Sequence, residues 1–134
     1  MNYFSITKRQ VRGVTVLDIR GKLKGCGGRV TLREAIFHSL EEGHDQIILN
    51  LAQVSTIDSS CLGELVSIHF HFKDRGAKMR MVLSQSLQRL VTLTNLMNTF
   101  DICDDEADAL DKFLYDTLDP YKQALIILPR DLDD

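Results

Sequence analysis

The sequence predicts one α/β domain in which a mixed, mostly parallel sheet of about five strands is flanked by about four helices. The 134 residues, 44% apolar and 26% charged, suffice for one hydrophobic core and are too few for two domains. A hairpin pattern opens the chain, an unbroken apolar run lies in its middle, and strand-like and helix-like segments alternate after it. This order, β-β-α-β-α-β-α-β-α, implies right-handed crossovers and a functional edge where the parallel strands end.

The first two strands are expected at residues 3–7 and 14–19, joined through residues 10–13, where a glycine supplies the unusual backbone angle of a turn. The glycine-rich residues 21–28 follow and favour a flexible surface loop. Their spacing does not suit a phosphate-binding loop, because Val30 stands where the G-x-G-x-x-G pattern requires glycine.

A capping box marks the first helix, because Thr31 and Glu34 can each satisfy a backbone N–H group at the other residue. The helix is expected over about residues 32–42, and Gly43 supplies its stop. The apolar run at residues 47–52 has no polar alternation. It therefore predicts a strand that is buried on both faces, lies at the centre of the sheet and is parallel to a neighbour.

The remaining segments continue the alternation. They are a helix that ends at residues 74–76, a strand at 79–83, a helix around 87–94, a short strand at 99–102 and a last helix around 110–118. Pro120 is expected to end that helix, so that residues 1–119 form the domain and residues 120–134 a C-terminal extension. The four aliphatic residues 125–128 should pack on the domain, or pair with a second copy as an added strand, and packing within one chain is favoured.

The composition bears on partners and compartment. A formal net charge of −3, with lysine and arginine scattered along the chain, argues against nucleic acid or an anionic membrane as the main partner. Three cysteines without a C-x-x-C pair fit a reducing compartment, and neither a signal peptide pattern nor an apolar run of membrane-spanning length is found. We therefore expect a cytoplasmic protein.

The sequence offers no catalytic, metal or cofactor site. His69 and His71 are two residues apart on a predicted helix and point to nearly opposite sides, whereas chelation from a helix requires a spacing of four. The G-x-S-x-G pattern of a serine hydrolase is absent, because Asp58 directly precedes Ser59. We therefore expect a protein that is not an enzyme and holds no metal or cofactor.

The most informative segment is the serine pair Ser59 and Ser60, set where a strand becomes a helix. The free N–H groups and positive dipole of a helix N-terminus suit an anion or a phosphorylated hydroxyl there, although a simple helix cap is the commoner reading. Cys61 lies in the first turn. It is either a thiol activated by the helix dipole or, as we favour, a small residue that fills a tight gap.

The run at residues 47–51, followed by Val54, by Ile57-Asp58-Ser59-Ser60 and by residues 62–66, resembles bacterial anti-sigma factor antagonists of the STAS domain family. Further stretches match the family pattern in the same order along the chain: residues 21–23, Arg75-Gly76, residues 90–96 and residues 104–113. The resemblance covers roughly residues 3–115. The segment Asp58-Ser59-Ser60 in its strand-to-helix setting is the most specific part.

The resemblance implies a STAS-type fold and a phosphorylation switch. It implies that Ser59 is the phosphate acceptor of a serine kinase that doubles as the anti-sigma factor, and that a protein phosphatase reverses the modification. The unmodified protein would bind the kinase and so free a sigma factor for transcription. The residues expected to contact the partner around Ser59 are Asp58, Ser60, Cys61, Leu62 and Gly63.

This chain departs from the family pattern in three places. Cys61 stands where members usually have glycine, which can hinder the close approach of a partner, and Lys24 and Asn50 stand where many have aspartate. The alternative function is a STAS scaffold subunit of a signalling or lipid-transport assembly, with Ser59 as a cap only. An enzyme of phosphate or thiol chemistry is a distant third, and a homodimer is left open.

Overall fold

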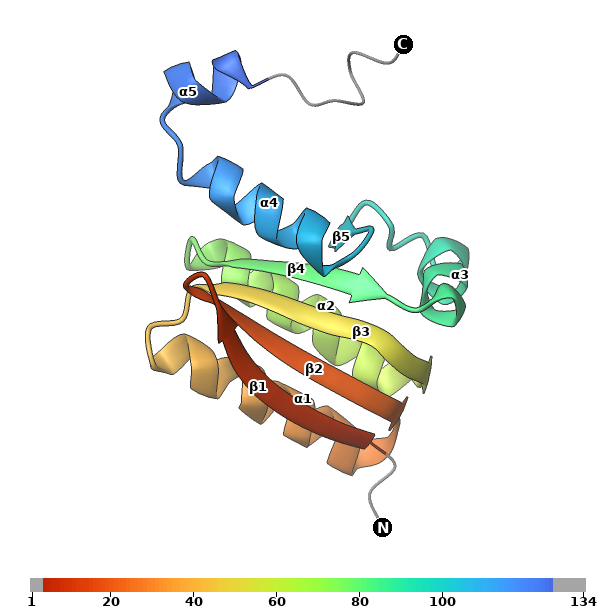
Figure 1. Ribbon diagram of the computed structural model, residues 1–134. Helices are drawn as coiled ribbons and strands as arrows, with labels where there is room; N and C mark the ends of the chain where they lie inside the picture. The colour runs from red at the N-terminus through yellow and green to blue at the C-terminus, as the bar shows by residue number, and fades with distance from the viewer. Residues whose placement is uncertain (1–3, 127–134) are drawn as a thin grey trace.

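The computed structural model describes residues 4–126 and shows a five-stranded sheet with helices on both faces (Figure 1). The strands are β1 (Phe4–Val11), β2 (Val14–Leu23), β3 (Gln46–Ile57), β4 (Lys78–Leu83) and β5 (Asp101–Cys103). They lie in the sheet in the order β1-β2-β3-β4-β5, with β1 antiparallel to β2 and all other pairs parallel. The predicted mixed, mostly parallel sheet is confirmed.

Five helices occur in the described part of the chain, one more than expected. They are α1 (Gly25–Glu41), α2 (Ser59–Asp74), α3 (Gln85–Leu93), α4 (Glu106–Asp116) and α5 (Pro120–Leu125). Figure 1 shows α1 and α2 side by side behind the sheet, α4 across the other face, and α3 beyond the C-terminal end of β4. The additional helix is α5, which stands away from the sheet beyond α4.

Strand β3 is the centre of the sheet and of the core, as its apolar run predicts. Ile47, Leu49 and Leu51 join the large core cluster with residues of α1 and α2, whereas Ile48 packs in the second cluster with Phe113 of α4. Both faces of the strand are therefore buried, which explains why polar and apolar residues do not alternate in its sequence. The strand continues beyond residue 52, because its pairing with β2 resumes after two register shifts and runs to the end of both strands.

The hairpin between β1 and β2 is tighter than the sequence suggests. Strand pairing extends to Val11 and Val14, so that only Arg12 and Gly13 form the turn. Both have positive φ angles, 52° and 81°, the conformation whose twist matches that of the flanking strands.

The expectation of a loop at residues 21–28 is wrong, because α1 already begins at Gly25. The predicted capping box is not the helix start either, since residues 31–34 lie inside α1. Contacts with the neighbouring strand-to-helix junction determine the earlier start. The Gly25 N–H group donates to the Asp58 carboxylate over 2.6 Å, and Gly28 is buried beside Cys61.

The C-terminal elements also differ in their bounds. Pro120 does not merely end a helix: it is the first residue of α5, and Asp119 caps this helix by accepting a hydrogen bond from the Lys122 N–H group over 2.8 Å. Leu125 and Ile126 are 64% and 43% exposed, so this part of the aliphatic run does not pack on the domain. Residues 127 and 128 lie outside the described part of the chain.

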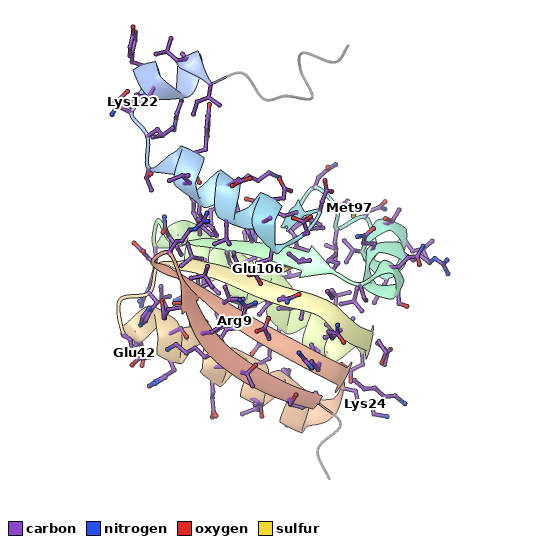
Figure 2. The ribbon with its side chains drawn as sticks, in the orientation of Figure 1. Arg9, Lys24, Glu42, Met97, Glu106 and Lys122 are labelled. Carbon is purple, nitrogen blue, oxygen red and sulfur yellow. The ribbon has the colours of Figure 1, made fainter. Side chains whose placement is uncertain are left out.

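An ion-pair network connects α4 to the first two strands. Arg9 of β1 donates to Asp18 of β2 over 2.6 Å and pairs with Glu106 at the start of α4, and Figure 2 shows Arg9 and Glu106 on this face of the sheet. The hydrogen bond from Arg9 is the main cause that holds the pKa of Asp18 below its usual value. Asn50 of β3 also donates to Asp18, over 2.8 Å, so the network reaches the central strand.

Candidate functional site

The junction between β3 and α2 is organised around one carboxylate. Asp58 precedes α2 in an extended conformation, and its Oδ1 atom accepts hydrogen bonds from the Cys61 N–H group over 2.9 Å and from the Ser60 hydroxyl over 2.8 Å. Its Oδ2 atom accepts from the Gly25 N–H group over 2.6 Å, and its own N–H group donates to the Leu23 carbonyl over 3.0 Å. Asp58 therefore caps α2 and fixes the start of α1 against it.

These hydrogen bonds determine the charge state of Asp58. The backbone N–H group of Gly25, and then that of Cys61, stabilise the carboxylate and hold the pKa of Asp58 well below its usual range. A carboxylate of such low basicity is a poor acceptor for a serine proton. Asp58 is thus a fixed negative charge with a capping role.

The two serines differ in their availability. Ser60 uses its hydroxyl to donate to Asp58. Ser59 is the first residue of α2 and is exposed, and within residues 4–126 its hydroxyl makes no hydrogen bond. Of the two hydroxyls, that of Ser59 is the one open to a reagent or partner from outside.

Cys61 points into the protein. The residue is fully buried, and its Sγ atom lies 3.9 Å from the Gly25 carbonyl and 3.3 Å from the position that a Cβ atom on Gly28 would occupy. Burial, and then the neighbouring Asp58, raise the pKa of its thiol to about 11. The idea of a thiol activated by the helix dipole is therefore wrong, and the packing role is confirmed.

The expected contact residues divide into two groups. Ser59, Ser60 and Gly63 are exposed and Asp58 is half-buried, so these four share the surface at the start of α2. Cys61 and Leu62 are buried, with Leu62 9% exposed, and both side chains belong to the large core cluster. These two side chains face the core from the first turn of α2. They therefore support the exposed part of that turn from the inside.

Sequence reasoning missed the first turn of α1 as part of this site. Gly25, Cys26 and Gly27 are exposed, and Gly25 is hydrogen-bonded to the same carboxylate that caps α2. The available signal was the run of small residues at 25–28 directly after a strand, because glycines without a side chain allow two backbone segments to approach closely. The candidate surface therefore extends from α2 to the start of α1.

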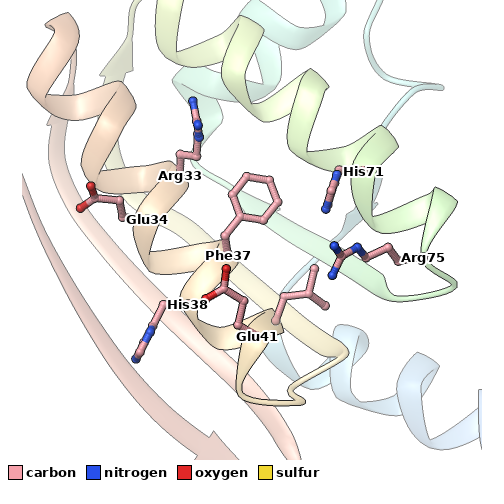
Figure 3. A pocket seen from close by; sticks show the side chains of 8 residues that line it. Arg33, Glu34, Phe37, His38, Glu41, His71 and Arg75 are labelled. Atoms are coloured by element: carbon pink, nitrogen blue, oxygen red, sulfur yellow. The ribbon is translucent and has the colours of Figure 1, made fainter.

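A hollow of about 520 Å³ lies between α1 and α2 and is lined by residues of both helices (Figure 3). Phe37 of α1 meets His71 of α2 edge-to-face, with ring centroids 4.8 Å apart. Arg75 and Glu41 line the same hollow, so its charges are mixed. It lies toward the C-terminal end of α2 and does not include the serine pair.

Two further properties concern the described residues 4–126. In this part of the chain, no group of three or more His, Cys, Asp or Glu side chains is arranged to hold a metal ion. None of its helices is long and apolar enough to cross a membrane.

Comparison with known proteins identifies the family. The model of the STAS domain matches residues 5–109, which is most of the chain. The chain belongs to the STAS domain family. Its exposed serine pair therefore lies on a recognised STAS framework, and no curated protein matches the chain closely enough to serve as a relative.

Several solved structures share this STAS fold. TM1081 of Thermotoga maritima, a candidate anti-sigma factor antagonist, is 26% identical, with a TM-score of 0.72 over 80% of this chain and 92% of that one. An anti-sigma factor antagonist of Mycobacterium paratuberculosis is 19% identical, with a TM-score of 0.69 over 81% of this chain and 92% of that one. The antagonist SpoIIAA in its unphosphorylated form is 19% identical, with a TM-score of 0.64 over 82% of this chain and 98% of that one. At 19% identity the last two show the fold alone.

Proposed function

We propose that this STAS domain is an anti-sigma factor antagonist that binds a serine-kinase anti-sigma factor and is switched off by phosphorylation of Ser59. The observation that carries the proposal is the exposed Ser59 hydroxyl, which has no hydrogen bond within residues 4–126, beside a Ser60 hydroxyl that is bonded to Asp58. A kinase requires a hydroxyl that can reach into its active site. Ser59 meets that requirement better than Ser60.

The unmodified protein would capture the anti-sigma factor and so release a sigma factor for transcription. Phosphorylation would end the capture, and a protein phosphatase would restore it. SpoIIAA from Bacillus is known in a phosphorylated form as well, with a TM-score of 0.62 to this chain against 0.64 for the unphosphorylated form. A fold of this kind is therefore compatible with the added phosphate, which supports a switch that acts at the surface.

The charges at the junction support the same mechanism. A phosphate on Ser59 adds about −1.5 to −2 charges, which the positive end of the α2 dipole tolerates. The ionised Asp58 repels these charges, so the phosphate would be directed outward toward a partner. A charged and hydrated group in the centre of an interface costs desolvation energy, which would weaken the complex.

The surface around Ser59 suits close approach of a partner. Asp58 and Ser60 lie beside the acceptor, and Gly63 lies one helical turn further along α2. A Cβ atom on Gly63 would meet nothing within 4 Å, so this glycine leaves open space on the helix surface. In this proposal Cys61 and Leu62 position the turn from within instead of touching the partner.

The site has the features of a substrate and not of a catalyst. Asp58 is too weakly basic to activate Ser59, and the thiol of Cys61, with a pKa of about 11, stays protonated at neutral pH. We therefore assign no enzymatic activity and no cofactor to the protein. A role with a kinase and a sigma factor would place it in the cytoplasm.

The proposal is tested by mixing the full chain with candidate serine kinases and ATP and measuring the intact mass. We expect one added phosphate on the wild type and on Ser60→Ala, and none on Ser59→Ala. Ser59→Ala should still bind the kinase, whereas Ser59→Asp should stay folded and bind weakly. Phosphate on Ser59→Ala, or binding of Ser59→Asp at the wild-type level, would show that the switch assignment is wrong.

A second function, a scaffold subunit that acts through its C-terminal part, is favoured by the apolar surface on α4 and α5. Leu114, Tyr121 and Leu125 are 59%, 74% and 64% exposed, and all lie beyond the region matched by the family model. Large apolar side chains that stay exposed are the kind that contact surfaces use. A second copy of the chain or another subunit of an assembly would cover this surface without using Ser59.

A further inference from the structure

The end of the domain that carries Ser59 is rich in positive charge. Five of the 16 lysine and arginine residues lie within residues 20–33, a segment without a carboxylate, so the positive charges are less scattered than the whole sequence suggests. The segment runs from the carboxyl end of β2 into α1, and Figure 1 shows both at the same end of the sheet as the start of α2. The five residues of this basic cluster are Arg20, Lys22, Lys24, Arg29 and Arg33.

Strand pairing and hydrogen bonds place two of these lysines beside the serine pair. Lys22 pairs in the sheet with Thr56, three residues before Ser59, and its exposed side chain makes no ion pair within residues 4–126. Lys24 directly precedes α1, whose first N–H group donates to Asp58 over 2.6 Å. Lys24 is also exposed, and Figure 2 shows it at this end of the sheet.

The two arginines of α1 extend the cluster along the start of α2. Burial, and then Asp58, raise the pKa of the Cys61 thiol, and Arg29 is near enough to act in the opposite direction. The Nη1 atom of Arg33 lies 3.7 Å from the Oε1 atom of Glu64. Asp58 and Glu64 are the only carboxylates within residues 52–64, so the five cations leave an excess of three positive charges at this end.

The carboxylates of the chain are concentrated elsewhere. Residues 101–119, which contain β5 and α4, hold eight carboxylates and one lysine. Several of these carboxylates are paired with cations of the sheet: Glu106 with Arg9, Asp101 with Arg80, and Asp116 with Lys78 and Arg80. The acidic segment is thus partly neutralised by the fold. The basic cluster keeps its excess charge, which a partner from outside can complement.

We propose that the basic cluster docks an acidic surface of the anti-sigma factor that the chain binds. The inference rests on the proposed function, because it names the surface chemistry of the partner that meets Ser59. Opposite charges across an interface raise the association rate and suppress partners of the wrong charge. A protein is favoured over nucleic acid, because the net charge of −3 repels an extended polyanion, whereas an acidic patch has to match this end only.

The same charges connect the docking surface to the phosphorylation switch. A phosphate on Ser59 adds about −1.5 to −2 charges, which offset much of the positive excess at this end of the domain. It would also repel an acidic partner directly. Phosphorylation would therefore slow the capture of the anti-sigma factor as well as weaken the complex.

The test measures the association and dissociation rates of the full chain with the kinase that phosphorylates Ser59, at about 50 and about 200 mM NaCl. We expect the association rate constant to fall at least fivefold at the higher salt concentration, because the added ions screen the basic cluster. Lys22→Glu should lower it at least fivefold at the lower concentration and change the dissociation rate constant less than twofold. An association rate constant that neither change affects would overturn the proposal.

A matched control separates this surface from the net charge of the chain. Lys73 is exposed on α2, 14 residues after Ser59 and about 21 Å away along the helix axis, and Lys73→Glu changes the charge by the same amount. It should change the association rate constant less than twofold. Lys24→Glu should act like Lys22→Glu, so that misfolding of one variant, detected by circular dichroism, leaves the other. Equal slowing by Lys73→Glu and by the cluster variants would contradict the proposal.

A titration without the kinase distinguishes failure of this inference from failure of the proposed function. The ¹⁵N-labelled full chain is titrated with polyglutamate and with a thymidine oligonucleotide of equal charge. We expect saturable NMR shifts in residues 20–33 with polyglutamate, and at least twofold weaker binding by Ser59→Asp. Tighter binding of the oligonucleotide would overturn the protein partner. Polyglutamate binding without phosphorylation by any kinase would reject the proposed function alone, whereas phosphorylation with salt-independent association would reject this inference alone.

Discussion

Helices α1 and α2 start side by side, yet their starts have different causes. Asp58 caps α2 through the N–H group of Cys61, three residues further along the same chain. The side chain of Lys24, at the corresponding position before α1, does not cap its helix, and the Gly25 N–H group bonds instead to Asp58, 33 residues away. One start is encoded locally, whereas the other requires the folded neighbour. A single carboxylate serves both.

The largest expected effect follows from removing that carboxylate. Asp58→Ala should lower the free energy of unfolding by about 3 kcal/mol, because it removes a helix cap and a charge-assisted hydrogen bond to the second helix. Asp105→Ala is the matched control, since Asp105 caps only its own helix, α4, through the Asp108 N–H group at 2.8 Å. The control should cost about 1 kcal/mol. Urea unfolding measures both, and equal losses would show that Asp58 does not connect the two starts.

The cysteines at the two starts should differ strongly in reactivity. Cys26 of α1 is exposed, whereas Cys61 of α2 is buried with a thiol pKa of about 11. A pKa two units above that of an ordinary thiol lowers the thiolate population about 100-fold at neutral pH, and burial slows access further. Labelling of the native protein with a thiol reagent, followed by peptide mass analysis, should show Cys26 reacting at least 100-fold faster. Comparable rates would contradict the burial of Cys61.

The glycines of the first turn of α1 offer a smaller and sharper test. A Cβ atom on Gly27 would meet nothing within 4 Å, whereas one on Gly28 would lie 3.3 Å from the Cys61 Sγ atom. Gly27→Ala should therefore raise the free energy of unfolding by about 0.5–1 kcal/mol. The Gly28→Ala variant should be less stable than the Gly27→Ala variant by about 1 kcal/mol.

A double mutant identifies the cause of that difference. Gly28→Ala in a Cys61→Ala background should regain most of the shortfall, because the sulfur atom is gone. Thermal or urea unfolding of the wild type, the two single mutants Gly28→Ala and Cys61→Ala, and the double mutant gives the coupling energy between the two positions. A shortfall that persists without the sulfur atom would exclude the proposed close contact.

The smallest effect on stability is expected at α5, because the start of this helix is stabilised only by residues adjacent to it in the sequence. Asp119 and Pro120 form its cap, no residue of α5 is buried, and one hydrogen bond, from Gln123 to the Tyr115 carbonyl at 3.0 Å, connects its side chains to α4. Truncation after Asp119 should change the free energy of unfolding by less than about 1 kcal/mol. Light scattering of both proteins then tests the homodimer, since loss of size on truncation would support it. A large loss of stability in a monomer would contradict the exposure of α5.

Much of the fold could be predicted from residue patterns that act over short distances. The run at residues 47–52 predicts the central strand, because both of its faces are apolar in the sequence and both are buried in the structure. The capping residues predict the start of α2, because Asp58 acts within one turn of its own helix. The strand β5 was predicted at residues 99–102 instead of 101–103, and the helix α5 was not predicted, since a three-residue strand and a six-residue helix have too few residues to show a period.

For the candidate site, the sequence by itself determined that a serine pair follows an aspartate at a strand-to-helix junction. Tertiary structure decided which hydroxyl is open, because Asp58 engages Ser60 and leaves Ser59 exposed. It also decided that Cys61 is buried, with a raised thiol pKa, and that α1 begins at Gly25. The physical reason is common to these outcomes: each depends on a group from the neighbouring helix or strand, and a one-dimensional pattern carries no distance between segments that meet only in the fold.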